Sequence, residues 1–198
     1  MTVSAVSRMW LKVGGALLII ALTVLIALLT LLPSTARSST PADRIALLQS
    51  VPTGLGSFNR GPVAEHDWAS RVGVDPAQSH AATTVSGWHV WLASSGAKAC
   101  LFYVPPGALG PGAACGNIDD AAVGNLAVTL AGEPSHGVTV IGVVPNDVSD
   151  VVIQTKDGQT VPTTAQDNVF VAHSDGRPVS YSFTGPDGAR SYPVATDQ

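Results

Sequence analysis

The chain of 198 residues is poor in charge, aromatic rings and sulfur. Only 12% of its residues are charged and 6% are aromatic, and it holds two cysteines and two methionines. Two cysteines without short-spaced Cys or His neighbours do not suit a tetrahedral zinc site. The sequence also lacks a Gly-x-Ser-x-Gly elbow and other catalytic or nucleotide-binding motifs. We therefore expect no cofactor and no enzyme of the classes that those motifs define.

Positive charge is scarce in most of the chain. Residues 45–198 carry six Lys and Arg against thirteen Asp and Glu, a balance of −7 with histidine neutral. An acidic surface repels phosphate backbones, which argues against a nucleic-acid partner. A length of about 150 residues suits one domain with its own hydrophobic core.

Charge is absent altogether from residues 13–32. These twenty residues, at 1.5 Å each, are long enough to cross a hydrocarbon core of about 30 Å, and they predict a transmembrane helix. Arg8 and Lys12 precede the span without any acid, which favours an inner N-terminus. The alternative is a signal peptide cleaved after Ala36, although signal peptides carry a shorter apolar region of about 7–15 residues.

The predicted span divides the chain into four parts. Residues 1–12 form a cytoplasmic stub, 13–32 the transmembrane helix, 33–44 a linker and helix start, and 45–198 an extracytoplasmic domain. The predicted localisation is therefore the cell membrane, with a single pass and the C-terminal domain outside.

Both cysteines, Cys100 and Cys115, fall in the predicted outer domain. Thiols tend to pair in an oxidising compartment, so we predict a disulfide between them. It would close a loop of about fifteen residues, worth about 3 kcal/mol by the chain-entropy treatment. The alternative is two separate buried thiols.

Two short helices are indicated by their capping residues. Thr40 as N-cap and Asp43 in the first turn predict a helix that follows Pro41 and ends near Ser50. Asn117 predicts a second, brief helix that Gly124 ends. Residues 51–82 are rich in glycine and proline and are interpreted as irregular, with a short helical turn near 64–71.

From residue 83 onward, short β-type runs alternate with turn residues. Residues 88–92 and 99–104 predict a hairpin through Ser94-Ser95-Gly96, and Asp-Gly pairs at 157–158, 175–176 and 187–188 predict further hairpins. The fold class is therefore mainly β: an antiparallel meander, sandwich or barrel with one or two short helices, preceded by a single N-terminal transmembrane helix.

Finer features of the strands also follow from the sequence. Pro162 and Pro193 cannot donate to a ladder, so their strands should lie at an edge or carry a bulge. In residues 179–184 the alternation predicts that Val179, Tyr181 and Phe183 share one buried face.

Four segments resemble those of small uncharacterised membrane-anchored proteins of actinobacteria. They are Pro-Ala-Asp-Arg at 41–44, Gly-Val-Asp-Pro at 73–76, Ile-Gly-Val-Val-Pro-Asn-Asp-Val at 141–148, and Asp-Asn-Val-Phe-Val at 167–171. The resemblance implies a spanning helix followed by an extracytoplasmic β domain. It transfers no activity and no functional residue.

Glu65, His66 and Asp67 form the densest cluster of acid, base and ligand types. They could hold a metal ion or serve a hydrolase. The simpler interpretation is an exposed polar loop, because adjacent residues rarely converge on one ion and a zinc site needs three or four protein ligands. The adjacent pair Ser135-His136 is likewise better explained as part of a turn.

Two further groups have structural explanations. Asp119 and Asp120 could bind calcium, but calcium takes six or more oxygen ligands, and two acids at a helix start are explained by the helix dipole. Trp68, Trp88 and Trp91 could stack on sugars, but in a chain with few large residues they should build the core.

These observations favour a membrane-anchored extracytoplasmic module without enzymatic activity, which binds or helps assemble envelope components. An envelope protein or a cell-wall component is the expected partner, beside the membrane itself. The alternative is a hydrolase or metal-dependent enzyme centred on His66.

Overall fold

The computed structural model describes residues 40–54, 72–82, 87–106, 112–131 and 137–194. All of them belong to one compact unit that runs from Ser39 to Gln198. The predicted span at 13–32 and the cleavage alternative at Ala36 lie outside the described residues, as does the predicted helical turn at 64–71. Within the described ranges, no helix combines the length and the apolar character needed to cross a bilayer.

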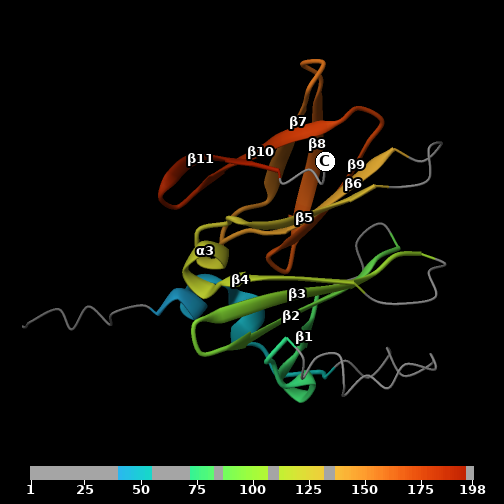
Figure 1. The fold of residues 1–198 in the computed structure, drawn as a ribbon. Helices are drawn as coiled ribbons and strands as arrows, with labels where there is room; N and C mark the ends of the chain where they lie inside the picture. The colour runs from blue at the N-terminus through green and yellow to red at the C-terminus, as the bar shows by residue number, and fades with distance from the viewer. Residues whose placement is uncertain (1–39, 55–71, 83–86, 107–111, 132–136, 195–198) are drawn as a thin grey trace, which may run out of the picture. The chain divides into compact units, whose positions relative to one another are not determined.

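The described strands form two antiparallel sheets (Figure 1). The small sheet has the order β1-β2-β3-β4, and the large sheet has the order β11-β10-β7-β8-β9-β6-β5. The predicted class, mainly β and antiparallel, is thereby confirmed. The strands are β1 His80–Ala81, β2 His89–Ser95, β3 Lys98–Val104, β4 Gly112–Asn117, β5 Leu126–Ala131, β6 Val138–Val143, β7 Asp150–Thr155, β8 Thr160–Gln166, β9 Val169–Ser174, β10 Pro178–Gly185 and β11 Gly188–Pro193. Four short helical segments accompany them: η1 Pro41–Arg44, η2 Ala46–Gln49, η3 Pro76–Gln78 and α3 Ile118–Ala122.

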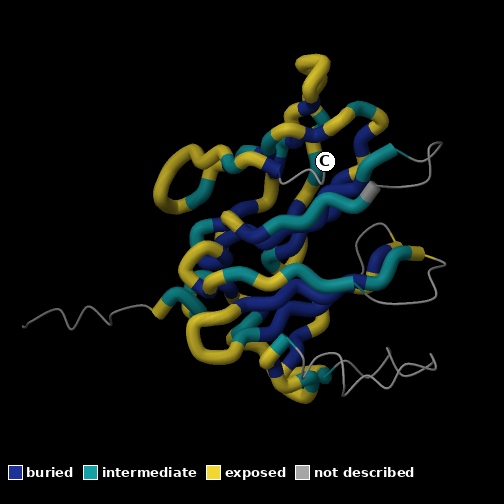
Figure 2. Tube along the Cα trace, in the orientation of Figure 1, coloured by how far each residue is buried: buried dark blue, intermediate teal, exposed yellow. Residues whose placement is uncertain are grey.

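Two main hydrophobic cores hold these strands together. Figure 2 shows buried residues along strands of both sheets. The first lies between the sheets, where Leu92 and Leu101 of the small sheet pack with Ile141 of the large sheet. The second joins strands of the large sheet alone, for example Phe170 on β9 with Tyr181 on β10. Their ring centroids are 5.3 Å apart. The large sheet therefore curls over its own core as a half-barrel.

The bend of the large sheet lies between β8 and β9. These strands pair only at Ala165–Phe170 and Gln166–Val169. Farther along, the Thr163 hydroxyl donates to the Val171 carbonyl at 3.1 Å. The two strands can therefore diverge and wrap the second core without leaving that carbonyl unsatisfied.

The predicted helix from Thr40 to Ser50 is wrong in type. The structure has two 3₁₀ turns, η1 and η2, with Ile45 extended between them at φ −124° and ψ 97°. Ile45 is fully buried. The amides of Ala46 and Leu47 donate to side chains elsewhere in the fold, so they cannot build an α-helical ladder. The predicted first turn is correct in one respect, because Asp43 accepts from the Thr40 amide at 2.7 Å.

The predicted hairpins are correct at three of the four turns. Gly96 and Ala97 join β2 to β3, so Ser94 and Ser95 belong to the strand and not to the turn. The turns at 157–158 and 187–188 join β7 to β8 and β10 to β11. The hairpin at 175–176 is wrong, because β10 pairs with β7 and not with β9. Strand β9 already has β8 and β6 as neighbours, so no edge remains for β10.

Both prolines lie where their missing backbone N–H deprives no neighbouring strand of a hydrogen bond. Pro193 is on β11, an edge strand, and Pro162 is on the part of β8 that β9 does not pair. Tyr181 and Phe183 are buried as predicted, but Val179 remains 39% exposed. The pairing of β10 with β7 shifts between Pro178 and Ser180, and this bulge turns Val179 away from the core.

The second predicted helix is confirmed as α3. The Asn117 side chain accepts from the Asp119 amide at 3.0 Å, and Gly124 ends the segment at φ +85°. Tyr181 and Tyr192 donate to the carbonyls of Gly124 and Val123, at 2.6 and 2.8 Å. These two bonds fix the end of α3 on the second core.

Candidate functional site

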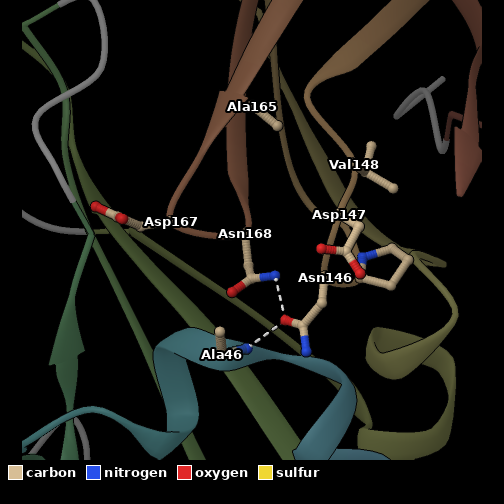
Figure 3. A pocket seen from close by; sticks show the side chains of 8 residues that line it. Ala46, Asn146, Asp147, Val148, Ala165, Asp167 and Asn168 are labelled. Carbon is tan, nitrogen blue, oxygen red and sulfur yellow. Dashed lines mark hydrogen bonds between the residues drawn. The ribbon is translucent and has the colours of Figure 1, made fainter. Parts of the chain in front are cut away.

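Three segments that the sequence analysis singled out meet at one place (Figure 3). They are η1 and η2, the 145–148 connection between β6 and β7, and the Asp167-Asn168 turn between β8 and β9. The Asn146 amide nitrogen of the backbone donates to the Arg44 carbonyl at 2.8 Å. Its side chain accepts from the Ala46 amide at 2.6 Å and donates to the Asp43 carbonyl at 3.0 Å. Asn146 thus ties the N-terminal turns to the large sheet.

Asn168 makes the matching set of bonds from the other side. Its side-chain oxygen accepts from the Leu47 amide at 2.9 Å. Its side-chain nitrogen donates to the Val144 carbonyl and to the Asn146 side chain, each at 3.1 Å. The two asparagines therefore spend nearly all of their hydrogen-bonding capacity on the protein itself. They hold the junction in shape and leave ligand contacts to their neighbours.

The backbone at this junction is unusual. Among the described residues other than glycine, positive φ occurs at Asp147 (66°), Asp167 (49°) and Asn168 (64°). Asp167 and Asn168 form the two-residue loop of a hairpin, whose type I′ turn requires positive φ at both positions. Asn and Asp tolerate this conformation better than other side chains. The residue types at the junction thus follow from its geometry.

A hollow of about 450 Å³ opens beside the junction. Asp147 and Asp167 line it together with the two asparagines. The carboxylates of Asp147 and Asp167 do not converge in Figure 3, where Asp167 points away from the asparagine pair. Across the described ranges, no group of three or more His, Cys, Asp or Glu is placed to hold a metal ion.

A second hollow, of about 370 Å³, shares Asp147 with the first. Asp150 of β7, Ser182 and Thr184 of β10, and Arg190 of β11 line it. We call the two hollows together the groove. In the described part of the chain, Arg44 and Asp187 form an ion pair at 2.9 Å, whereas none joins Arg190 to Asp147 or Asp150. Arg190 pairs with Phe183, so its side chain leaves the sheet on the face opposite to that of Ser182 and Thr184.

The predicted disulfide is present. Cys100 on β3 and Cys115 on β4 are direct cross-strand partners with their Cα atoms 4.1 Å apart. Strand β4 was not predicted, because Gly112–Asn117 contains small residues without β-branched or aromatic side chains. The disulfide lies on the small sheet, away from the groove residues, which come from the large sheet and η2. Its role is to hold β4 on β3.

The other candidate residues lie either outside the described ranges or in the cores and the first turn of α3. Glu65, His66 and Asp67 lie outside the described residues, as do Trp68 and the Ser135-His136 pair. Trp88 and Trp91 are 6% and 4% exposed and belong to the cores, so they offer no stacking face. Asp119 and Asp120 lie in the first turn of α3, as the helix dipole favours.

One histidine has a perturbed environment. His80 is buried, and its Nδ1 lies 3.1 Å from the Ser50 hydroxyl, which donates to the Leu47 carbonyl at 2.7 Å. Burial lowers the pKa of His80, and a hydrogen bond with the Ser50 backbone opposes this shift in part. The contacts join β1 to the end of η2, which gives His80 a structural role.

Sequence reasoning did not single out Asn146, Asp147, Asp150, Asn168 or Arg190 as site residues. Two of the segments concerned, 141–148 and 167–171, had been noted for their resemblance to other proteins. Each of these segments has the composition of a turn when taken alone, so neither indicates a binding site by itself. Each of the two segments contains an adjacent pair of Asn and Asp residues. These residue types favour positive φ and accept hydrogen bonds from backbone amides, so the two pairs could have indicated the junction.

Comparison with known proteins identifies no relative of this chain. No family model matches the chain, and neither the curated proteins nor the solved structures contain a significant match.

Proposed function

We propose that this chain is a membrane-anchored extracytoplasmic protein that binds, or helps assemble, components of the cell envelope without being an enzyme. The span at residues 13–32 would place its N-terminus inside and the β unit outside. The disulfide Cys100–Cys115 supports the outer location, because disulfides persist in oxidising compartments.

The groove is the observation that carries a binding role. Its lining residues project from paired strands and from a junction locked by asparagine side chains, so the site is formed before any partner arrives. Preorganised sites lose less conformational entropy on binding. The asparagines serve the scaffold, while Asp147, Asp150 and Arg190 remain available to a partner.

Location is tested by attaching a tag to the C-terminus of the full chain in its native cell and adding protease to intact cells. The proposal expects loss of the tag while a cytoplasmic marker protein stays intact. Protection of the tag until the membrane is broken would contradict the outer location.

Binding is tested by sedimenting the full-length chain, kept in mild detergent, with insoluble envelope material from the same cell. We expect retention that survives His66→Ala and is lost when Arg190 and Asp150 are both changed to Ala. Release of soluble envelope fragments that depends on His66 would favour the hydrolase alternative.

A further inference from the structure

We propose that β5 pairs with the β5 strand of a second copy of this chain, antiparallel and about a two-fold axis at Thr129. Strand β5 ends the large sheet, and no described strand pairs with its other edge (Figure 1). An edge of this kind presents a row of backbone N–H and C=O groups to an added strand. The pairing joins two large sheets into one and does not involve the groove.

The outermost strands of the two sheets differ in how they are protected against such pairing. Strand β1 has only two residues, and β11 carries the charge of Arg190 and the missing donor of Pro193. Short length, charge and proline are common ways of protecting a sheet edge. Strand β4 has small side chains that give a partner little to pack against. Strand β5 has no charge, no proline and an unbroken pairing with β6 over all six residues, so its edge is unprotected.

The apolar side chains of β5 are incompletely covered. Val128 and Leu130 are only partly buried, although they pack against the first core. Ile141, which lies opposite Val128 on β6, is fully buried. The difference arises because β6 has a neighbouring strand on both sides and β5 on one side only. A second strand with apolar residues on the same face would complete the burial of Val128 and Leu130.

Thr129 selects the register of the pairing. Its hydroxyl oxygen is buried and has no hydrogen-bond partner among the described residues. Unsatisfied buried groups are rare and costly in folded proteins. In an antiparallel pair centred on Thr129, the two threonines lie opposite each other on one face, so one hydroxyl can donate to the other. The same register places Val128 of each copy opposite Leu130 of the other.

The charge distribution permits this contact between identical chains. Residues 45–198 carry thirteen acids against six bases, so most contacts between two copies would bring like charges together. Residues 121–132 contain no charged side chain. A two-fold contact uses the same surface of both copies, and β5 is a surface on which this causes no repulsion within the strand pair.

The test introduces one cysteine on an edge strand and measures cross-linking of the full-length chain in detergent micelles. Both native cysteines are joined in a disulfide, so the introduced cysteine is the only free thiol. Thr129→Cys puts two thiols opposite each other, with Cα atoms about 4.5–5.5 Å apart, which a disulfide can span. Val128→Cys and Ser191→Cys, the latter on β11, are the controls. With copper phenanthroline in air, Thr129→Cys should form a covalent dimer at least about tenfold faster than either control.

The mass of the native chain in density-matched detergent should be that of two copies. Thr129→Lys should reduce it to that of one, because two like charges would then face each other across the axis, and Ser191→Lys should leave it unchanged. Unchanged melting temperatures will show that these variants are folded.

Three results would overturn the inference. The first is a native chain with the mass of one copy. The second is a dimer in which Thr129→Cys cross-links no faster than Ser191→Cys, because the contact then lies elsewhere, for example in the predicted span at 13–32. The third is faster cross-linking of Val128→Cys than of Thr129→Cys, which would exclude the register centred on Thr129.

Discussion

At the scale of single residues, Gly124 shows how a backbone position can depend on having no side chain. It lies at φ +85°, and a Cβ atom there would come within 2.4 Å of the Phe183 ring. Gly158 has nearly the same φ, +83°, but a Cβ atom there would meet nothing within 4 Å. The two glycines therefore separate backbone strain from steric overlap.

We predict that Gly124→Ala lowers the free energy of unfolding by about 3 kcal/mol, since it combines left-handed strain with displacement of a buried ring. Gly158→Ala should cost only about 1 kcal/mol, from the strain alone. Denaturant unfolding of both variants checks the difference. Equal losses would show that Phe183 yields to the new methyl group without cost.

His80 makes stability depend on pH. Its pKa in the folded chain is lowered from 6.5, chiefly by burial. The unfolded chain therefore takes up this proton at a higher pH than the folded chain does. The contribution of neutral His80 is complete above the unfolded pKa and declines as the pH falls below about 6.5 toward the lower folded pKa.

We predict that His80→Gln reduces the loss of stability between about pH 7.5 and about pH 5.5, because glutamine keeps a polar group and does not titrate. Denaturant unfolding of both proteins at the two pH values measures the effect. A pH dependence equal to that of the native chain would assign the acid sensitivity to other groups.

At the scale of elements, the asparagine junction determines how η1 and η2 attach to the large sheet. Asn168 contributes both a left-handed backbone, at φ 64°, and three side-chain hydrogen bonds. Glycine at this position would keep the backbone and lose the bonds, whereas alanine would lose the bonds and add strain.

We predict that Asn168→Gly lowers the free energy of unfolding by about 2 kcal/mol, since the Leu47 amide and the Val144 carbonyl lose their side-chain partner. Asn168→Ala should cost about 1 kcal/mol more. Asp147→Gly is the matched control, because Asp147 shares the left-handed backbone and its side chain has no hydrogen bond to any described residue. Asp147→Gly should be neutral or slightly stabilising, and a comparable loss there would indicate that the asparagine bonds are not the cause.

The elements also show what a sequence can predict. Strands such as β3 and β10, and the turns at 157–158 and 187–188, follow from β-type runs and turn residues, and they were predicted. The β9-to-β10 crossover was not, because it depends on which strand edges are already occupied. The two 3₁₀ turns near Ile45 were mistaken for one helix, since the competing acceptors, Asn146 and Asn168, lie 100 and 121 residues from the amides that they bind.

The candidate site shows the same difference between local features, which the sequence predicts, and strand order, which it does not. Cys100 and Cys115 could be paired from the sequence, because the chain offers no other cysteine. The second hollow combines residues from three strands and one connection, and local patterns do not say which strands are neighbours. Asp150 and Ser182 are ordinary surface residues until the strand order places β7 beside β10.

At the scale of the whole molecule, the disulfide stabilises the small sheet against loss of β4. We predict that the double variant Cys100→Ala/Cys115→Ala lowers the free energy of unfolding by about 3 kcal/mol relative to the oxidised chain, as expected for a loop of this length. Denaturant unfolding with and without a reducing agent checks this. The native chain should respond to the reductant and the variant should not, whereas an unresponsive native chain would contradict the prediction.

The crossover from β9 to β10 has a consequence for how the protein is made. Strand β7 gains β8 as soon as that hairpin is synthesised, but its other neighbour, β10, emerges only after β9 is complete. Throughout that interval β7 displays unpaired backbone groups that can recruit a strand from another nascent chain. Rapid synthesis of the β10–β11 hairpin therefore protects the free edge of β7 from pairing with another copy. A chain stalled after β9 would be a substrate for aggregation or for quality-control proteases.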